Sequence, residues 1–150
     1  MTNENVDINI VLPILKRIPL FSSLDENLHR EIVSRIVMMY YPKDYTLFKE
    51  GDEGDALYII KTGQVEIFHN AKEEGLLPEK VATINENGFF GEMALISDAP
   101  RNASAKAVLD TEMFILNKTD FNVLLKTSTA LAEQISAAVV DRTNKNQQKS

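Results

Sequence analysis

The glycines of this 150-residue chain are confined to a single 41-residue stretch, residues 51–91. They occupy positions 51, 54, 63, 75, 88 and 91, and those at 51, 63, 75 and 88 recur every 12 or 13 residues. Glycine is favoured where the backbone takes a positive φ, so this spacing predicts regularly placed turns. The dipeptide Asn87-Gly88 is itself a common turn sequence. Short segments between such turns are typical of β-strands.

Apolar residues fill the segments between these turns. Residues 56–60 form a continuous apolar run, and residues 65–69 alternate in the manner of a half-buried strand. We also expect strands at residues 81–84, 103–108 and 113–116, and we expect residues 38–41 (MMYY) to form core and strand entry. Strands of this length and spacing predict an antiparallel sandwich or barrel rather than βαβ units. The chain is therefore expected to be mainly β.

Both flanks of the glycine-containing region have helical patterns. Ser23 to Glu26 reads as a capping box before a helix with one apolar face, and residues 11–18 predict an earlier short helix. After the β region, Asn117 and Thr119 are candidate helix caps, and a last helix is expected to end near Arg142. These patterns divide the chain into a helical lead-in (1–36), a β-barrel (37–117), C-terminal helices (118–143) and a disordered polar tail (144–150).

The net charge of −6 is unevenly distributed along the chain. Residues 43–92 carry 11 acidic and 5 basic residues, and therefore account for the whole deficit. Nucleic acids and anionic membrane surfaces favour proteins with a basic excess, so neither is an expected partner. Because no apolar run approaches 18 residues and no signal-peptide pattern opens the chain, we expect a cytoplasmic protein without membrane insertion.

Few residues are suited to catalysis or metal binding. The sequence has no cysteine and only two histidines, His29 on a predicted solvated helix face and His69 at a strand end. Metal-dependent β-barrel enzymes need about three histidines with an acid, and neither histidine lies near a candidate nucleophile. The acidic residues of the segment 51–55 lack the twelve-residue pattern of a calcium loop and are expected to form a solvated turn. The sequence thus predicts neither an enzyme nor a metal site.

Residues 89–104 carry the strongest functional signal (FFGEMALISDAPRNAS). Gly91 would let the backbone approach a ligand, and one helical turn over residues 93–95 would present amide hydrogens to an anion. Arg101, the only arginine between Arg35 and Arg142, would add a bidentate donor for phosphate. Glu92 would accept hydrogen bonds from hydroxyl groups. The alternative is a surface ion pair between Glu92 and Arg101, which would contribute about 0–1 kcal/mol.

This segment resembles the phosphate-binding cassette of the cyclic nucleotide-binding domain family. The resemblance rests on FGEMAL at residues 90–95 and PRNAS at residues 100–104, here called the cassette (residues 90–104). It extends upstream through GDEGD at 51–55, YII at 58–60 and GQV at 63–65, and downstream to residues 120–121 and 131–132. It covers about residues 15–142. The family includes regulatory subunits of cAMP-dependent protein kinase and bacterial catabolite activators, and it implies an antiparallel β-barrel, or jelly roll, with flanking helices.

The resemblance also implies a role for each cassette residue. Arg101 would pair with the phosphate of the ligand, helped by the backbone amides of Ala94 and Ala103. Glu92 would accept the ribose 2′-hydroxyl, and Gly91, next to Met93 in the same turn, would lie against the sugar. Further residues correspond to base contacts in relatives: Ile67 and Thr83 touch the base, and Ile135 or Val139 on the last helix would cap it.

Asn102 departs from the family pattern. Relatives that prefer cAMP often have alanine after the cassette arginine, and many that prefer cGMP have threonine. Asparagine can both donate and accept hydrogen bonds, so it is compatible with either purine. We expect cAMP as the ligand, with cGMP as the alternative.

Together these features predict a stand-alone regulatory module that senses a cyclic nucleotide. Ligand binding would draw in the C-terminal helix and signal to an unidentified effector protein in trans, with a homodimer through that helix as a further possibility. A DNA-binding domain is not expected, because only about eight polar residues follow Arg142. The alternatives are a sensor that prefers cGMP and an interaction domain of the same fold with a weak or unused pocket.

Overall fold

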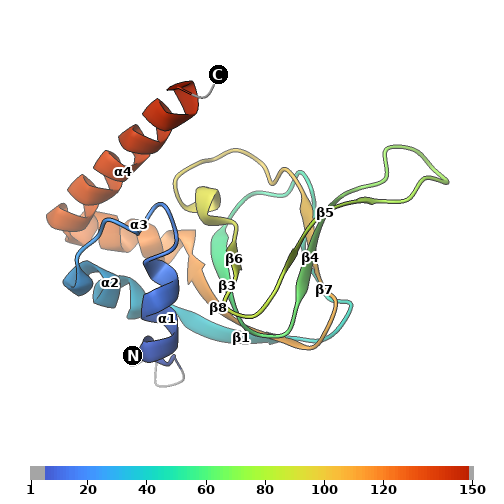
Figure 1. Cartoon of the computed structure of the whole chain (residues 1–150), viewed down its shortest axis with the longest axis horizontal. Helices are drawn as coiled ribbons and strands as arrows, with labels where there is room; N and C mark the ends of the chain where they lie inside the picture. Colours follow the sequence, from blue (N-terminus) through green and yellow to red (C-terminus); the bar gives the residue numbers. More distant parts are fainter. Residues whose placement is uncertain (1–5, 149–150) are drawn as a thin grey trace.

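The chain folds into a β-barrel with a group of helices packed on one side (Figure 1). The computed structural model describes residues 6–148, and side chains are described for residues 6–140. Two helices precede the barrel, α1 (Ile8–Leu15) and α2 (Glu26–Val33), and two follow it, α3 (Lys118–Thr127) and α4 (Thr129–Gln148). The predicted mainly β architecture with flanking helices is confirmed.

The barrel consists of two four-stranded antiparallel sheets. One has the order β1-β8-β3-β6, and the other has the order β2-β7-β4-β5. The strands are β1 (Val37–Tyr41), β2 (Thr46–Phe48), β3 (Ala56–Thr62), β4 (Val65–His69), β5 (Glu79–Ile84), β6 (Phe89–Phe90), β7 (Ser104–Ala107) and β8 (Thr111–Asn117). The bounds of β4 match the prediction, whereas the short strands β2 and β6 were not predicted.

Strand β3 is buried on both faces, which explains its uninterrupted apolar sequence. Tyr58 and Ile60 face the barrel interior, where they join a core with residues of β4, β7 and β8. Leu57 and Ile59 face the other way, into a second core that the four helices cover. A strand between two cores cannot alternate apolar with polar residues, because each face is removed from water.

The glycines serve two purposes rather than the single one predicted. Gly51, Gly63, Gly75 and Gly91 take positive φ values of 82–104°, as expected for turns. Gly54 does not, and an added Cβ there would lie 2.9 Å from the Cβ of Ala94. At the Asn87-Gly88 turn the positive φ (68°) belongs to the asparagine, and Gly88 is required because a Cβ would collide with Ile84. Close packing therefore explains the glycines at 54 and 88.

The N-terminal helices differ from the prediction in their starting points. Helix α1 begins three residues before the expected 11–18 segment, because the Asp7 carboxylate caps it by accepting from the Asn9 amide. The predicted capping box at Ser23 is wrong, since Asp25 is the N-cap of α2 and accepts from the Leu28 amide at 2.9 Å. Both helices use aspartate, whose side chain competes well for free amide groups at a helix start.

The prediction that His29 is solvated is also wrong. Its residue is 2% exposed, and its Nε2 lies 2.7 Å from the carbonyl oxygen of Phe21. The turn between α1 and α2 folds back over α2, so a position that looks polar on the isolated helix becomes buried. The reverse error concerns the MMYY segment, which forms strand β1 as expected but leaves Met39 (47%) and Tyr40 (58%) exposed.

Helix α4 continues to Gln148, beyond the predicted end near Arg142. The predicted tail is thus helical as far as Gln148, and residues 149–150 lie outside the described residues. Lysine and glutamine are good helix formers, and neither glycine nor proline follows Arg142 to end the helix. Within residues 6–148 no single helix has the length and hydropathy needed to cross a membrane, although α3 and α4 meet that test as a pair bent by 116°.

Candidate functional site

The cassette begins with a sharp turn at Gly91. Its φ of 82° is left-handed, and it starts a short 3₁₀ helix, η1 (Glu92–Leu95), directly after β6. The predicted helical turn over residues 93–95 is therefore present and begins one residue earlier. The Ala94 amide donates to the Gly91 carbonyl at 3.1 Å, so in this structure it closes the turn itself.

Arg101 is buried at the centre of the site, with only 9% of its surface exposed. Its Nη2 donates to the Ala56 carbonyl at 3.0 Å and lies 3.3 Å from the Asp55 carboxylate. Its Nε is buried and finds no hydrogen-bond partner among the described residues. A guanidinium is always charged, and a buried donor without a partner is costly, so an acceptor placed at Nε would stabilise this arrangement.

The glycine-containing loop after β2 holds the backbone of Arg101. The Gly51 amide donates to the Arg101 carbonyl at 2.8 Å, and the Arg101 amide donates to the Asp52 carbonyl at 2.7 Å. Glu53 and Pro100 form an isolated antiparallel bridge beside them. The loop is exposed, as predicted for a solvated turn, but it also fixes the position of the arginine, which the sequence pattern did not indicate.

Arg101 contributes to a cavity of about 230 Å³ next to η1. The cavity is also lined by residues of the cassette and of the preceding glycine-containing loop, among them Gly54, Gly91, Met93, Ala94 and Asn102. Met93 is 42% exposed and Asn102 is also exposed, so both lie at the rim. Ala103 is buried (7%) behind them. The surface ion pair considered as an alternative is wrong, because Glu92 and Arg101 are each only 9% exposed.

The two predicted base-contact residues lie on opposite faces of one sheet. Ile67 pairs with Ala82. Two residues away along the strands, Val65 pairs with Ile84, and this pair faces the barrel core. Thr83 pairs with Glu66, between these two, and successive residues of a strand point to opposite faces. Ile67 is therefore directed to the interior and Thr83 to the outside, so the structure does not bring Thr83 together with the cassette.

The predicted cap residues lie away from the Arg101 cavity. Ile135 is 4% exposed in the helical core, and Val139 is half-buried against the same core. Both line a second, more open cavity of about 600 Å³, together with Leu95 and Ile96 at the end of η1 and Leu125 of α3. In this arrangement α4 lies beside the end of η1 rather than over the arginine.

Lys118, the first residue of α3, connects the cassette to the C-terminal helices. Its Nζ donates to the Ser97 carbonyl at 2.9 Å and to the Asp98 carboxylate at 2.8 Å. The hydrogen bond and the positive charge of Lys118 lower the pKa of Asp98 below its usual range. A displacement of the cassette would therefore change the hydrogen bonds of Lys118 at the start of α3.

Aromatic side chains pack against the guanidinium of Arg101. The Cζ of Arg101 lies 4.1 Å from the ring centroid of Phe48 and 5.8 Å from that of Tyr58. Tyr58 stacks on Phe90 with centroids 5.1 Å apart and an interplanar angle of 11°. Burial, with a further contribution from Asp55, raises the pKa of Tyr58 to about 12. The sequence analysis missed Phe48 and Tyr58 as site residues, because no local motif links them to Arg101.

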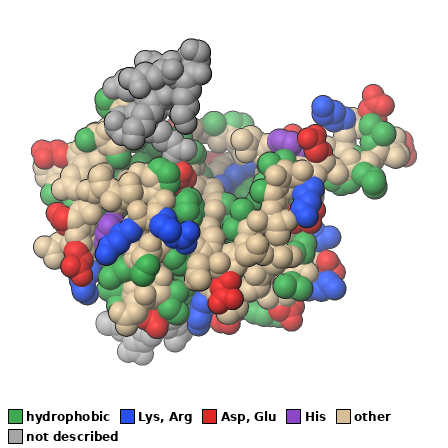
Figure 2. Space-filling model, viewed as in Figure 1, with side chains coloured by type: hydrophobic (Ala, Val, Ile, Leu, Met, Phe, Trp, Pro, Cys, Tyr) green, Lys and Arg blue, Asp and Glu red, His purple; other side chains and the backbone are tan. Residues whose placement is uncertain are grey.

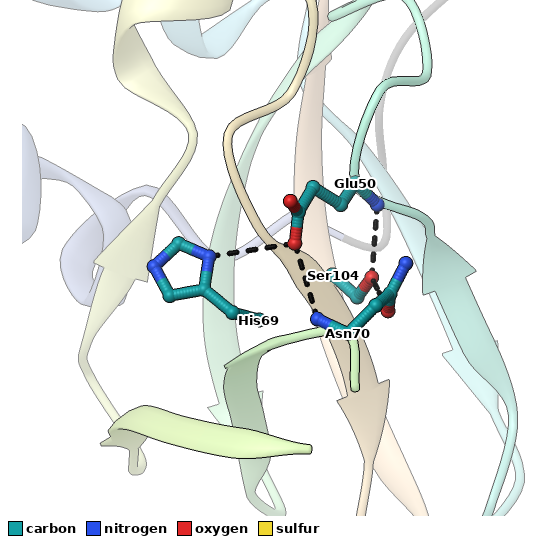
Figure 3. Close-up of polar contacts among 4 residues, drawn as sticks. All are labelled: Glu50, His69, Asn70 and Ser104. Carbon is teal, nitrogen blue, oxygen red and sulfur yellow. Dashed lines mark hydrogen bonds and ion pairs between the residues drawn. The ribbon is translucent and has the colours of Figure 1, made fainter. Parts of the chain in front are cut away.

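A polar cluster connects the end of the cassette to the start of the loop between β4 and β5 (Figure 3). The Ser104 hydroxyl accepts from the Glu50 amide and donates to the Asn70 side-chain oxygen, each at 2.8 Å. The Glu50 carboxylate accepts from the Asn70 amide at 3.1 Å and lies 3.4 Å from Nδ1 of His69, which ends β4 as predicted. Among the described residues, no group of three or more acidic or histidine side chains could hold a metal ion.

Fold and site together define a small-ligand binding domain: a β-barrel with one buried guanidinium facing a cavity beside a left-handed glycine turn. Comparison with known proteins is more specific, since residues 38–128 match the family described as the cyclic nucleotide-binding domain. The chain belongs to this family, which is regulatory rather than catalytic. The predicted resemblance is thereby confirmed.

Several known proteins are similar to the chain. It is 34% identical over 111 residues to a cAMP-dependent protein kinase regulatory subunit of Candida albicans, covering 74% of this chain and 23% of that protein. It is 32% identical over 130 residues to the cyclic AMP receptor protein of Thermus thermophilus, covering 85% of this chain and 58% of that protein. The N-terminal domain of a transcriptional regulator from Streptomyces coelicolor superposes with a TM-score of 0.79 at 27% identity, covering 90% and 95% of the two chains.

The chain spans about a quarter of the kinase regulatory subunits that it matches and 58% of the receptor protein. The shared part is the ligand-binding domain, so the activities of the complete relatives do not transfer with it.

Proposed function

We propose that this domain binds cAMP and acts as a cytoplasmic regulatory sensor rather than as an enzyme. The observation that carries the proposal is the buried Nε of Arg101, which lacks a partner among the described residues and lies beside a cavity next to η1. A phosphate monoanion would supply the missing acceptor and neutralise the charge. Relatives named as cAMP-dependent kinase subunits and a cyclic AMP receptor support cAMP over other cyclic nucleotides.

In this proposal each cassette residue contacts one part of the ligand. Arg101 and the backbone amides of Ala94 and Ala103 bind the phosphate, and the Ala94 amide must then be shared with or released from its bond to Gly91. The backbone of Gly91 lies against the sugar. Glu92 binds the ribose, and Ile67 contacts the base from the barrel interior. Thr83 would need the hairpin to move before it could contribute, because it faces outward.

Asn102 is the residue on which the choice of purine depends. It is exposed at the cavity rim and could reach either the phosphate or the base. A preference for cGMP remains the alternative. Figure 2 shows acidic and basic side chains interspersed on one face of the molecule, in keeping with a small anionic ligand rather than a nucleic acid.

The signal would leave the site through the C-terminal helices. Lys118 binds the cassette turn, and Leu95 and Ile96 contact the cavity formed by α3 and α4. A ligand that moves η1 would therefore change the position of α4, which could then bind an effector protein in trans or a second copy of the domain.

Thermal stability with added nucleotides tests the proposal. A ligand at ~100 times its Kd should stabilise the fold by about 2.7 kcal/mol, so we expect a raised melting temperature with cAMP, a smaller change with cGMP and none with 5′-AMP. Arg101→Ala and Glu92→Ala should abolish or reduce the shift. Arg30→Ala is the matched control, because Arg30 is exposed and pairs only with Glu26 among the described residues.

Each alternative has its own result. A larger shift with cGMP would select the cGMP sensor, and Asn102→Ala should then change the ratio of the two affinities. No shift with either nucleotide would favour the interaction domain with an unused pocket. A shift that survives Arg101→Ala would contradict the assignment of the site.

A further inference from the structure

Phe48 enters the site because strand β2 contains a bulge. In its pairing with β7, Thr46 lies opposite Lys106 and Phe48 opposite Ala105, so the register shifts between them. As a result, the consecutive residues Leu47 and Phe48 both pack against the barrel core, which a regular strand would not allow. The bulge turns the Phe48 ring under Arg101.

The Arg101 guanidinium lies over the Phe48 ring in a cation–π contact. The distance from Cζ to the ring centroid is 4.1 Å, and Arg101 is 9% exposed, so water screens the contact little. A cation over an aromatic face is attracted by the negative potential of the ring, most strongly when both groups are desolvated. Tyr58 and Phe90 flank Phe48 with centroids 5.9 and 6.2 Å away, which restricts the ring to this orientation.

The remaining contacts determine which donors of the guanidinium are available. Nη2 is used by the Ala56 carbonyl and lies near the Asp55 carboxylate. The other two nitrogens lie beside glycines that line the cavity: a Cβ added at Gly91 would be 2.8 Å from Nη1, and one at Gly54 would be 3.7 Å from Nε. With the guanidinium over Phe48 and Nη2 held by Ala56, the buried Nε remains without a partner among the described residues.

We propose that Phe48 is a positioning residue that holds the Arg101 guanidinium, through a cation–π contact, so that its Nε–H remains available to the phosphate of the ligand. The proposal rests on the proposed function for the identity of the ligand. An arginine side chain that is already ordered loses less conformational entropy on binding, so the contact raises affinity without touching the ligand.

Fluorinated phenylalanines at position 48 separate this role from simple packing. Successive fluorination weakens the negative potential of the ring while its shape changes little. We expect the Kd for cAMP, measured by calorimetry, to increase stepwise along the mono-, di- and trifluorinated series, by about threefold to thirtyfold in total. The same series at Phe21, which is 0% exposed in the helical core, should leave the Kd unchanged.

A measurement without ligand tests the contact independently of the proposed function. We expect trifluorination of Phe48 to lower the melting temperature of the native protein and to have no such effect in Arg101→Met. If this coupling is absent, the inference is overturned whether or not cAMP binds. If the coupling is present but the Kd is flat along the series, Phe48 is merely structural and the positioning role is overturned. Failure of the native protein to bind cAMP would instead refute the proposed function, with the coupling still deciding on the Phe48–Arg101 contact.

Discussion

Replacing Gly91 with alanine should damage both the stability of the fold and the binding site. Gly91 has a φ of 82°, and a left-handed conformation costs a residue with a Cβ about 1–2 kcal/mol. The new methyl group would also lie 2.8 Å from Nη1 of Arg101 and 3.0 Å from the Ala56 carbonyl oxygen. Arg101 must then move and weaken its bond to Ala56, and a hydrogen bond from a charged group contributes about 1.5–3 kcal/mol.

The two contributions predict a loss of about 2.5–5 kcal/mol in the free energy of unfolding. Gly75→Ala is the matched control, because Gly75 has a similar φ of 89° but no heavy atom within 4 Å of an added Cβ. It should lose only the backbone contribution of about 1–2 kcal/mol. The difference between the two variants therefore reports the contacts with Arg101 and the Ala56 carbonyl.

Urea unfolding gives the stability of each variant, and calorimetry gives the Kd for cAMP. We expect Gly91→Ala to weaken binding by at least about tenfold, corresponding to about 1.4 kcal/mol, and Gly75→Ala to leave binding unchanged. If the two variants lose equal stability and Gly91→Ala binds normally, then Arg101 is not held against Gly91, and the geometry of the site described above is incorrect.

Three further predictions concern ionisable groups. The pKa of Tyr58 is raised to about 12, so the neutral phenol contributes about 2–3 kcal/mol of stability below pH 10. This contribution is lost as the pH rises to about 12. Absorbance titration should show a late-ionising tyrosine that is missing in Tyr58→Phe. The pKa of Asp98 is lowered by Lys118, so their contact should persist above the usual carboxyl pKa and be lost as the pH falls through the lowered value. NMR titration of the carboxyl group should show this pKa returning toward its usual value in Lys118→Met. An unchanged pKa in that variant would refute the contact. His29→Ala should destabilise the fold by about 2–3 kcal/mol, because it leaves a cavity and removes the hydrogen bond to the Phe21 carbonyl. If urea unfolding shows a loss of less than about 0.5 kcal/mol in the free energy of unfolding, the burial of His29 is contradicted.

Features that depend on neighbouring residues were predictable from the sequence. The alternation in β4 indicated its bounds, and the short helical turn after Gly91 was expected over residues 93–95. The cassette could be identified for the same reason, since its glycine, its short helix and its arginine lie within about a dozen residues. Even the acidic loop at 51–55 was correctly expected to be an exposed turn.

Features that depend on pairing between distant segments were not predictable. Thr83 and Ile67 both looked suitable for contacting a base, but the register of β4 against β5 places them on opposite faces of the sheet. His29 looked solvated because an isolated helix does not reveal which segment will fold over it. These errors have one cause: the face that a side chain occupies depends on its partner strand or helix.

Arg101 has both kinds of feature, those that depend on neighbouring residues and those that depend on distant segments. The sequence by itself determined that this chain has a glycine turn and a single arginine suited to phosphate, because those properties belong to residue types in a local order. Only the tertiary structure decided that the guanidinium is buried and that its Nε has no partner among the described residues. The reason is that its partners, the Ala56 carbonyl and the Phe48 ring, come from β3 and a bulged β2, and they reach the arginine only once the two sheets have closed.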